Sequence, residues 1–388
     1  MKITNVKAIP LEVPVLSMEV PPESLPYYRE LVGIVFDSYK SVLVFVETDE
    51  GITGLGECMT RVAPQAMASI VNEILRPVVI GNDPLDYELI WEQGFATMRQ
   101  RGHNKGFMIE AISGVDIAIW DILGKFFNQP IYKLLGGKFR DKIKTYASSI
   151  RFKTPEDVVK ETSEIMEAGF KAVKLKIGRG VDEDIAAVKA IRNAFGNTIA
   201  VMVDANSGYT ENSAMKLGRA FERMEVEWFE EPIPPDNLEG YINLSRSLDI
   251  PIAAGESEFT RYGFRELITK RAIDIIQPNV GRAGGFTEIK KILAMASAFG
   301  IPYAPHTGSS GAPIMAAELH LATYAPGFLI HEYMRNAWSS EQANPLKDKI
   351  VNEKFEIFED GYLKIPSGVG LGITINEKYK EYLVKSTL

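Results

Sequence analysis

The chain has 388 residues, of which 46% are hydrophobic and 24% charged, and its formal net charge is −8. This composition is ordinary for a soluble globular protein, and no apolar run approaches the roughly 20 residues that a membrane span requires. The acidic balance argues against a nucleic-acid partner, because such proteins generally present a basic face to phosphates.

Cys58 is the only cysteine, so an intramolecular disulfide is excluded and we interpret Cys58 as a small packing residue. The N-terminus lacks the apolar stretch of a secretory signal, so a cytoplasmic location is expected. The length suits a β/α barrel of roughly 250 residues together with a smaller domain.

The first part of the chain reads as a sheet followed by helices. Apolar and polar residues alternate in residues 3–13 and 41–47, and a turn at 49–51 leads into a returning strand at 52–57, which together predict an antiparallel sheet. Helical patterns follow at residues 63–75, 87–98 and 109–126. This order predicts an α+β domain, which we place at residues 1–135.

From residue 142 onward short β-rich runs alternate with helical stretches, which is typical of a parallel sheet. The predicted strands lie at residues 142–150, 171–177, 199–204, 228–230, 252–256, 273–277, 301–306 and 328–332. Eight strands are enough to close a barrel. We place this barrel at residues 136–350, and we expect a C-terminal segment, 351–388, to pack back on the first domain.

Polar residues recur near the ends of these strands, at intervals of 18 to 32 residues that suit one βα unit each. They are Lys174, Lys176, Asp204, Glu230, Glu256, Asp274, His306 and Glu332. In a barrel such positions meet at the mouth.

Three of them, Asp204, Glu230 and Glu256, each close an apolar run. Carboxylates that converge repel one another, so a hard cation such as Mg²⁺ is the natural counter-charge. Glu231 follows Glu230 directly and is expected to face the other way. The alternative is that each acid is a helix N-cap or a loop charge.

Lys174 and Lys176 leave the same face of one strand. Each ammonium disfavours protonation of the other, so one lysine could act as a base. A solvated lysine-rich edge is the alternative. His306 lies in a polar loop, and Asp274 could hydrogen-bond its ring to form an acid/base dyad. A buried structural histidine is the alternative there, and it is our interpretation of His103, His320 and His331.

At these residues the chain resembles the enolase superfamily, in its mandelate racemase-like branch. The similar motifs are K-x-K at Lys174 and Lys176, D-x-N at Asp204 and Asn206, E-E-P at residues 230–232 and G-E at residues 255–256. Residues 51–57, 114–121 and 130–137 resemble the capping domain and barrel entry of that family. The resemblance covers nearly the whole chain and implies a modified (β/α)7β TIM barrel with an N-terminal capping domain.

The resemblance implies Mg²⁺-assisted removal of the proton α to a carboxylate through an enediolate, a mechanism in which such sites use a lysine or histidine base. Asp204, Glu230 and Glu256 would hold the ion. Lys176 would be the base on one face, and His306, oriented by Asp274, the acid/base on the other. Lys174 and a protonated Glu332 would assist the substrate carboxylate.

Within this branch we favour an acid-sugar dehydratase that converts an aldonate or aldarate to a 2-keto-3-deoxy acid. A racemase or epimerase of a 2-hydroxy acid is the nearest alternative, and a metal-binding barrel without catalysis is a second. Muconate cycloisomerase and dipeptide epimerase types carry a lysine at the sixth strand, where Asp274 was placed, so we do not favour them.

In this family specificity resides largely in capping-domain loops, here residues 16–35 and 57–61. Tyr28, Arg61 and Asn206 are the candidate substrate contacts, with solvated surface as the alternative for Tyr28 and Arg61. Relatives of this type also form homo-oligomers, so a dimer or octamer is expected. The expected partner is therefore a small carboxylate sugar, with neither nucleic acid nor membrane involved.

Overall fold

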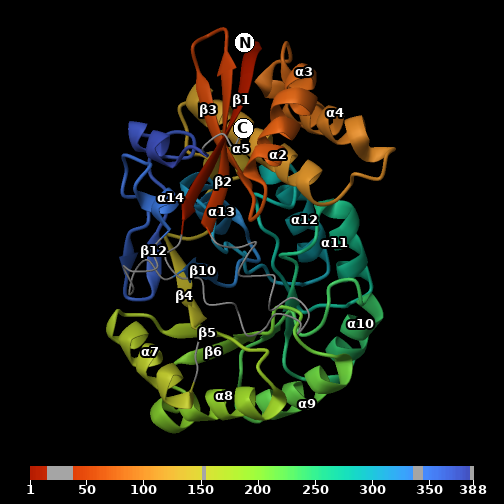
Figure 1. Ribbon diagram of the computed structural model, residues 1–388, viewed down its shortest axis with the longest axis vertical. Coiled ribbons are helices and arrows are strands. Elements are labelled where there is room, and N and C mark those ends of the chain that lie inside the picture. The colour runs from red at the N-terminus through yellow and green to blue at the C-terminus, as the bar shows by residue number, and fades with distance from the viewer. Residues whose placement is uncertain (15–37, 151–153, 335–343, 385–388) are drawn as a thin grey trace.

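The computed structural model describes residues 1–14, 38–150, 154–334 and 344–384. It confirms a β/α barrel with an N-terminal domain of antiparallel strands and helices set against one end (Figure 1). Of the predicted substrate contacts, Tyr28 lies outside the described residues, as does the whole loop 16–35. Within the described part of the chain, none of the helices combines the length and the apolar character needed to cross a membrane.

The N-terminal domain begins with a three-stranded antiparallel sheet in the order β1-β2-β3. Its strands are β1 (Ile3–Pro14), β2 (Ser38–Thr48) and β3 (Thr53–Met59), and its helices are α2 (Pro64–Ser69), the π-helix η1 (Ile70–Leu75), α3 (Arg76–Val79), the 3-10 helix η2 (Pro84–Asp86), α4 (Tyr87–Arg99), α5 (Phe107–Phe126) and α6 (Ile131–Leu135). Helix α5 is buried along most of its length. It lies so close to β3 that a Cβ at Gly54 or Gly56 would be 2.0 Å from a carbonyl oxygen of α5.

The barrel begins at β4 and continues as a parallel sheet. Its strands are β4 (Lys142–Ile150), β5 (Ala172–Lys176), β6 (Ala200–Asp204), β7 (Phe229–Glu230), β8 (Ile252–Ala254), β9 (Ile275–Ile276) and β10 (His331–Met334). Its helices are α7 (Pro155–Glu167), α8 (Val181–Phe195), α9 (Glu211–Glu222), α10 (Leu238–Ser247), α11 (Thr260–Thr269), α12 (Gly285–Ala298) and α13 (Ala312–Tyr324). The helices form the outer layer (Figure 1).

The ring of strands closes because β10 pairs with β4 in parallel. The predicted strand at residues 301–306 is reduced to one position, Tyr303, which bridges to Ile276 on one side and to Phe328 on the other. Pro302 precedes this position and cannot donate a backbone hydrogen bond, which limits regular pairing there.

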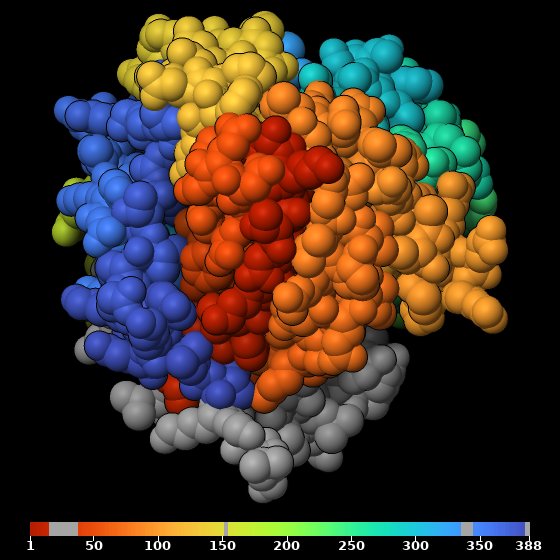
Figure 2. Space-filling model, turned by 90° about the horizontal axis from the view of Figure 1, so that it is seen from above, coloured from red at the N-terminus to blue at the C-terminus, as the bar shows by residue number. Residues whose placement is uncertain are grey.

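After β10 the chain forms α14 (Pro345–Asp348), and the C-terminal segment then contains β11 (Phe358–Glu359), β12 (Tyr362–Lys364) and the 3-10 helix η4 (Glu377–Tyr382). Strand β12 pairs antiparallel with the first residues of β4. Further along, Leu383 bridges to Leu11 of β1, and Gly370 bridges to Pro130. Figure 2 shows this segment, in blue, flanking the N-terminal strands in red and orange.

A layer of eight buried residues forms one cluster, with one residue from each strand position around the ring: Tyr146, Ala172, Met202, Trp228, Ala253, Ile275, Ala304 and Ile330. Side chains two residues apart on a strand share a face. The residues two positions further along are therefore expected to form the next layer toward the barrel mouth. They are Ser148, Lys174, Asp204, Glu230, Gly255, Gln277, His306 and Glu332. An apolar layer thus supports an almost entirely polar one.

Candidate active site

Strand register brings one lysine and two acids together at the barrel mouth. Lys176 on β5 pairs with Asp204 on β6, and Asp204 pairs with Glu230 on β7. Asp204 and Glu230 are buried, with 0% and 1% exposure. Since paired residues of neighbouring parallel strands lie side by side, Lys176 lies next to Asp204 and Asp204 lies next to Glu230.

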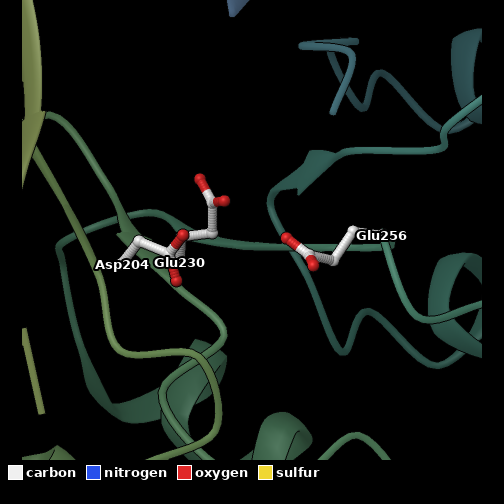
Figure 3. Close-up of side chains that lie close together, drawn as sticks. All are labelled: Asp204, Glu230 and Glu256. Carbon is white, nitrogen blue, oxygen red and sulfur yellow. The ribbon is translucent and has the colours of Figure 1, made fainter. Parts of the chain in front are cut away.

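The acids Asp204, Glu230 and Glu256 form a group that could hold a metal ion, with one carboxylate oxygen of each lying within 4.8 Å of the others. In Figure 3 the side chains of Asp204 and Glu230 lie next to each other, and the carboxylate of Glu256 faces them from the opposite side. Glu256 follows Gly255, which has a φ of 138° and where a Cβ would lie only 3.0 Å from the backbone nitrogen of Gln277.

The donor set fits a hard divalent cation. All three groups are carboxylates, the ligands that Mg²⁺ prefers. One oxygen of Glu256, Oε2, is buried and receives no hydrogen bond within the described residues. A buried carboxylate oxygen without a donor is costly unless a cation satisfies it.

Glu230 is held by three donors. Nζ of Lys174 lies 2.5 Å from its Oε1, while the indole of Trp228 and the amide of Gln277 donate to its Oε2 at 3.1 and 2.8 Å. Burial nevertheless outweighs these contacts and the lysine charge, and it raises the pKa of Glu230 to about 8. A pKa raised in this way means that Glu230 needs a further positive charge nearby to stay ionised.

Lys174 is 1% exposed and lies among carboxylates. Its Nζ is 2.5 Å from Glu230, 3.0 Å from Glu332 and 3.5 Å from Asp204. Lys176 donates to Asp204 at 2.5 Å and to the side-chain oxygen of Asn206 at 2.7 Å.

Burial lowers the pKa of each lysine, but the surrounding carboxylates outweigh burial, so both values lie above the ordinary one. The expected mutual depression by the two ammonium groups is therefore overridden by the acids. A cation bound to the same carboxylates would oppose this rise, because it adds positive charge beside the ammonium groups.

Glu332 differs from its predicted protonated state. Burial alone would raise its pKa, but Lys174 and further positive groups outweigh burial and hold the pKa of Glu332 well below its usual range. Ser148 donates to one oxygen at 2.6 Å, and the backbone amides of Thr307 and Gly308 donate to the other at 2.7 and 3.1 Å. Glu332 is thus a carboxylate that anchors the loop after His306.

His306 is 4% exposed and lies next to Glu256, whereas Lys176 lies next to Asp204. Its Nε2 is 3.3 Å from Oε2 of Glu256. Burial lowers its pKa, and the charges of Lys174 and Arg61 lower it further against the opposing effect of Glu256 and Glu332. Arg61, a predicted substrate contact, therefore lies close enough to influence the site, on an exposed position of the capping domain.

The predicted pairing of Asp274 with His306 is wrong. Asp274 precedes β9, and its carboxylate accepts a hydrogen bond from the backbone of Ile252 at 2.9 Å and lies 3.4 Å from Oγ of Ser245. The inward-facing series of this strand is Ile275, Gln277 and then 279, so Asp274 belongs to the opposite face. Asn279 lies beside His306 instead, with Nδ2 3.2 Å from Nδ1 of the ring.

Glu231 also departs from the prediction, because strand alternation ends at Glu230. Glu231 has a left-handed φ of 38° and is 4% exposed. Burial raises its pKa, and so do the charges of Glu256, Asp204 and Glu230. A fourth carboxyl group therefore borders the triad. The place of Glu231 beside the triad was missed in the sequence because strand alternation was extended beyond Glu230.

A separate cavity of about 1040 Å³ lies between the C-terminal segment and the start of β4, and residues such as Lys142, Phe355 and Leu371 line it. None of the acids, lysines or histidine described above contributes to its lining. The candidate acid/base residues therefore lie at the barrel mouth and not in this cavity.

Fold and site together define a β/α-barrel enzyme whose acidic triad lies between a lysine and a histidine. Residues 157–379 match the family model described as enolase C-terminal domain-like, and residues 31–136 match the N-terminal domain of the mandelate racemase / muconate lactonizing enzyme family. The chain belongs to the enolase superfamily, in its mandelate racemase-like branch.

Relatives of this chain include sugar-acid enzymes. It is 36% identical to D-galactarolactone cycloisomerase of Agrobacterium fabrum, over 89% of this chain and 92% of that protein. It is also 36% identical to arabinonate dehydratase of Saccharolobus solfataricus, over 91% and 93%. D-galactonate and D-xylonate dehydratases match at 31–35% identity. The crystal structure of 3,6-anhydro-D-galactonate cycloisomerase from Zobellia galactanivorans superposes with a TM-score of 0.86 at 30% identity, covering 99% of this chain and all of that one.

Proposed function

We propose that this protein is a Mg²⁺-dependent dehydratase of an acid sugar, an aldonate or aldarate, which it converts to a 2-keto-3-deoxy acid. The observation that carries the proposal is the register of Lys176, Asp204 and Glu230, by which a basic side chain lies directly beside carboxylates that could hold a metal ion. The relatives named dehydratases of arabinonate, galactonate and xylonate support this substrate class.

Asp204, Glu230 and Glu256 would hold the ion. When bound, Mg²⁺ supplies positive charge that stabilises the negative charge developing on a substrate carboxylate. Lys174 adds a second, permanent positive charge from within the barrel, since its ammonium lies within 3.5 Å of Asp204, Glu230 and Glu332. Such charge is needed because a proton α to a carboxylate is only weakly acidic.

In its neutral form Lys176 is the group placed to act as the base. The C2–H bond breaks, the proton passes to Nζ of Lys176, and the electron pair moves into the carboxylate as an enediolate. That pair then returns to form the C2–C3 double bond as the C3–O bond breaks and hydroxide leaves. The resulting enol takes a proton at C3 and becomes the 2-keto acid.

The alternatives share the first of these steps. A racemase would return a proton to C2, and a cycloisomerase of a sugar lactone, which the relative from Agrobacterium fabrum is named for, would expel a ring oxygen. The sixth strand leads to Asn279, whose side chain lies beside His306. Muconate cycloisomerase types carry a lysine at this position, so that type is disfavoured by Asn279 and not by Asp274.

The test is a screen of aldonates, aldarates and their lactones with the purified protein and Mg²⁺, read by NMR. A 2-keto-3-deoxy product from one acid is the expected result. Lys176→Ala should abolish it, while the matched control Lys171→Ala should not, because Lys171 is exposed and pairs only with Asp360 within the described residues. An epimer without a keto product, or a keto acid formed from a lactone by ring opening without loss of water, would assign the protein to one of the alternatives.

A further inference from the structure

Asn279 follows β9 and is fully buried behind the ring of His306. Its side-chain nitrogen Nδ2 lies 3.2 Å from Nδ1 of His306 and donates to the backbone oxygen of His306 at 3.0 Å. Its side-chain oxygen accepts a hydrogen bond from the backbone amide of Gly281 at 2.8 Å. Both ends of the amide are therefore engaged.

These contacts settle which end of the amide is which. A backbone N–H can only donate and a backbone carbonyl can only accept. The atom beside the amide of Gly281 must therefore be the oxygen of Asn279, and the atom beside the carbonyl of His306 must be its NH₂ group. The group that faces Nδ1 of the ring is consequently a donor.

A donor at Nδ1 requires a lone pair on that nitrogen. In the neutral ring the single proton then resides on Nε2, which faces the site 3.3 Å from Oε2 of Glu256 but makes no hydrogen bond to that oxygen. A carboxylate at position 279 would act in the opposite sense. It would accept the Nδ1 proton and leave Nε2 with the lone pair that a base needs.

We infer that Asn279 is a positioning residue that fixes His306 as an Nε2–H hydrogen-bond donor, so that Lys176 is the only base among the site residues that the structure describes, and protons are removed from one face of the substrate carbon alone. This inference rests on the proposed function for its chemical consequence. The location of the proton on the His306 ring is inferred from the contacts of Asn279 alone.

Neighbouring residues hold Asn279 and the ring of His306 in place. The next residue, Val280, donates its backbone amide to the buried Glu318 at 2.6 Å, which holds the loop that carries Asn279. A Cβ at Gly308 would lie 2.7 Å from Cε1 of His306, so this loop approaches the ring closely.

The proton balance of dehydration follows. Lys176 takes the proton from C2 and becomes an ammonium. The departing 3-hydroxide accepts that proton from the ammonium of Lys176 and leaves as water. His306 keeps its own proton and acts as a hydrogen-bond donor throughout. Both transfers occur on the face of Lys176. The enzyme is therefore expected to act on one C2 epimer, by syn elimination, and not to racemise it.

The direct test is ¹⁵N NMR of the full chain with labelled histidine, with and without Mg²⁺. The chain has only four histidines, so the signals of His306 are identified by their loss in His306→Gln. The expected signature is a proton on Nε2 and a bare Nδ1, inverted in Asn279→Asp and unchanged in the control Asp274→Asn. A proton on Nδ1 in the wild-type protein would overturn the inference, whether or not Asn279→Asp folds.

The second readout is exchange of the C2 hydrogen in D₂O for both C2 epimers of the acid that the screen identifies. The wild-type protein should exchange only one epimer. Asn279→Asp should gain exchange on the other by on the order of a hundredfold, the lower range of a general base contribution. Exchange of both epimers by the wild-type protein would overturn the inference. If no acid reacts at all, the proposed function fails, while the ring signature still decides the state of His306.

Discussion

Glu57 connects the capping domain to the loop that follows His306, and its replacement by glutamine tests that connection. Its side chain on β3 is 1% exposed. Oε1 accepts from Oγ of Ser41 at 2.6 Å and from the backbone of Gly311 at 2.9 Å, and Oε2 accepts from the backbone of Ile314 at 3.1 Å. Helix α13 has no side-chain cap of its own at Gly311, so Glu57 supplies one from the other domain.

Three effects set the size of the change in Glu57→Gln. If the new amide oxygen keeps the contacts of Oε1, its NH₂ group faces the amide of Ile314, and a buried N–H without an acceptor costs about 1–3 kcal/mol. Losing a negative charge at a helix N-terminus costs about 0.3–1 kcal/mol more. Burial raises the pKa of Glu57, so a neutral side chain regains part of that cost. The unpaired amide is the largest effect, and a loss of about 2 kcal/mol is expected.

Urea unfolding of Glu57→Gln, followed by circular dichroism, measures this loss. Glu47→Gln is the matched control, because Glu47 is exposed on neighbouring β2 and surface changes usually stay within about 0.5 kcal/mol. The turnover assay should also show a raised KM, since the loop from His306 to Gly311 loses its anchor. Equal stability of the two variants would refute the role given to Glu57.

Glu230→Gln should weaken Mg²⁺ binding by on the order of 10–100-fold, as for loss of other groups that support a metal, and calorimetry that shows unchanged affinity would remove Glu230 from the site. Gly308→Ala should lower kcat sharply, because its Cβ would meet the His306 ring at 2.7 Å, whereas Gly361→Ala, also at positive φ but 3.4 Å from its nearest neighbour, should leave kcat unchanged. Burial raises the pKa of Asp116 from 3.8 to about 7. The folded protein then keeps a proton that the unfolded chain releases, so Asp116 lowers stability as the pH rises from about 4 to 7. Asp116→Asn should reduce the fall in melting temperature between pH 5 and pH 8. A fall as large as that of the wild-type protein would contradict the raised pKa of Asp116.

The fold could be predicted from the sequence because each barrel strand has a distinct apolar run and each run is followed by a helical pattern. β4 was predicted with its observed limits, 142–150. Strands of two residues, such as β7 and β9, gave a weaker signal. At residues 301–306 most of the predicted strand has no regular pairing, and only Tyr303 joins the ring.

The site was predictable where a functional side chain ends its apolar run, as Asp204, Glu230 and Glu256 do, and the structure brings these three together. Asp274 instead precedes the apolar pair of β9, which places it at the wrong end of the strand. Its interval of 18 residues from Glu256 was also the shortest of the series, whereas Asn279 gives 23.

Other site residues could not be found by searching for acids and bases. Gln277 and Trp228 hold Glu230 through neutral donors, and neither residue type signals a metal site by itself. The period-two pattern does identify Gln277, because it lies two positions after Ile275 of the apolar layer. The role of Asn279 depends on a contact across 27 residues of chain, which only the structure reveals.

The most direct measurement is the fate of deuterium placed at C2 of the acid that the screen identifies. With the Mg²⁺-loaded protein, the account predicts that all of this deuterium appears in water as the 2-keto-3-deoxy acid forms, and that Lys176→Ala releases none. Deuterium that remains on carbon in the product, or release that persists in Lys176→Ala, would contradict proton abstraction by Lys176.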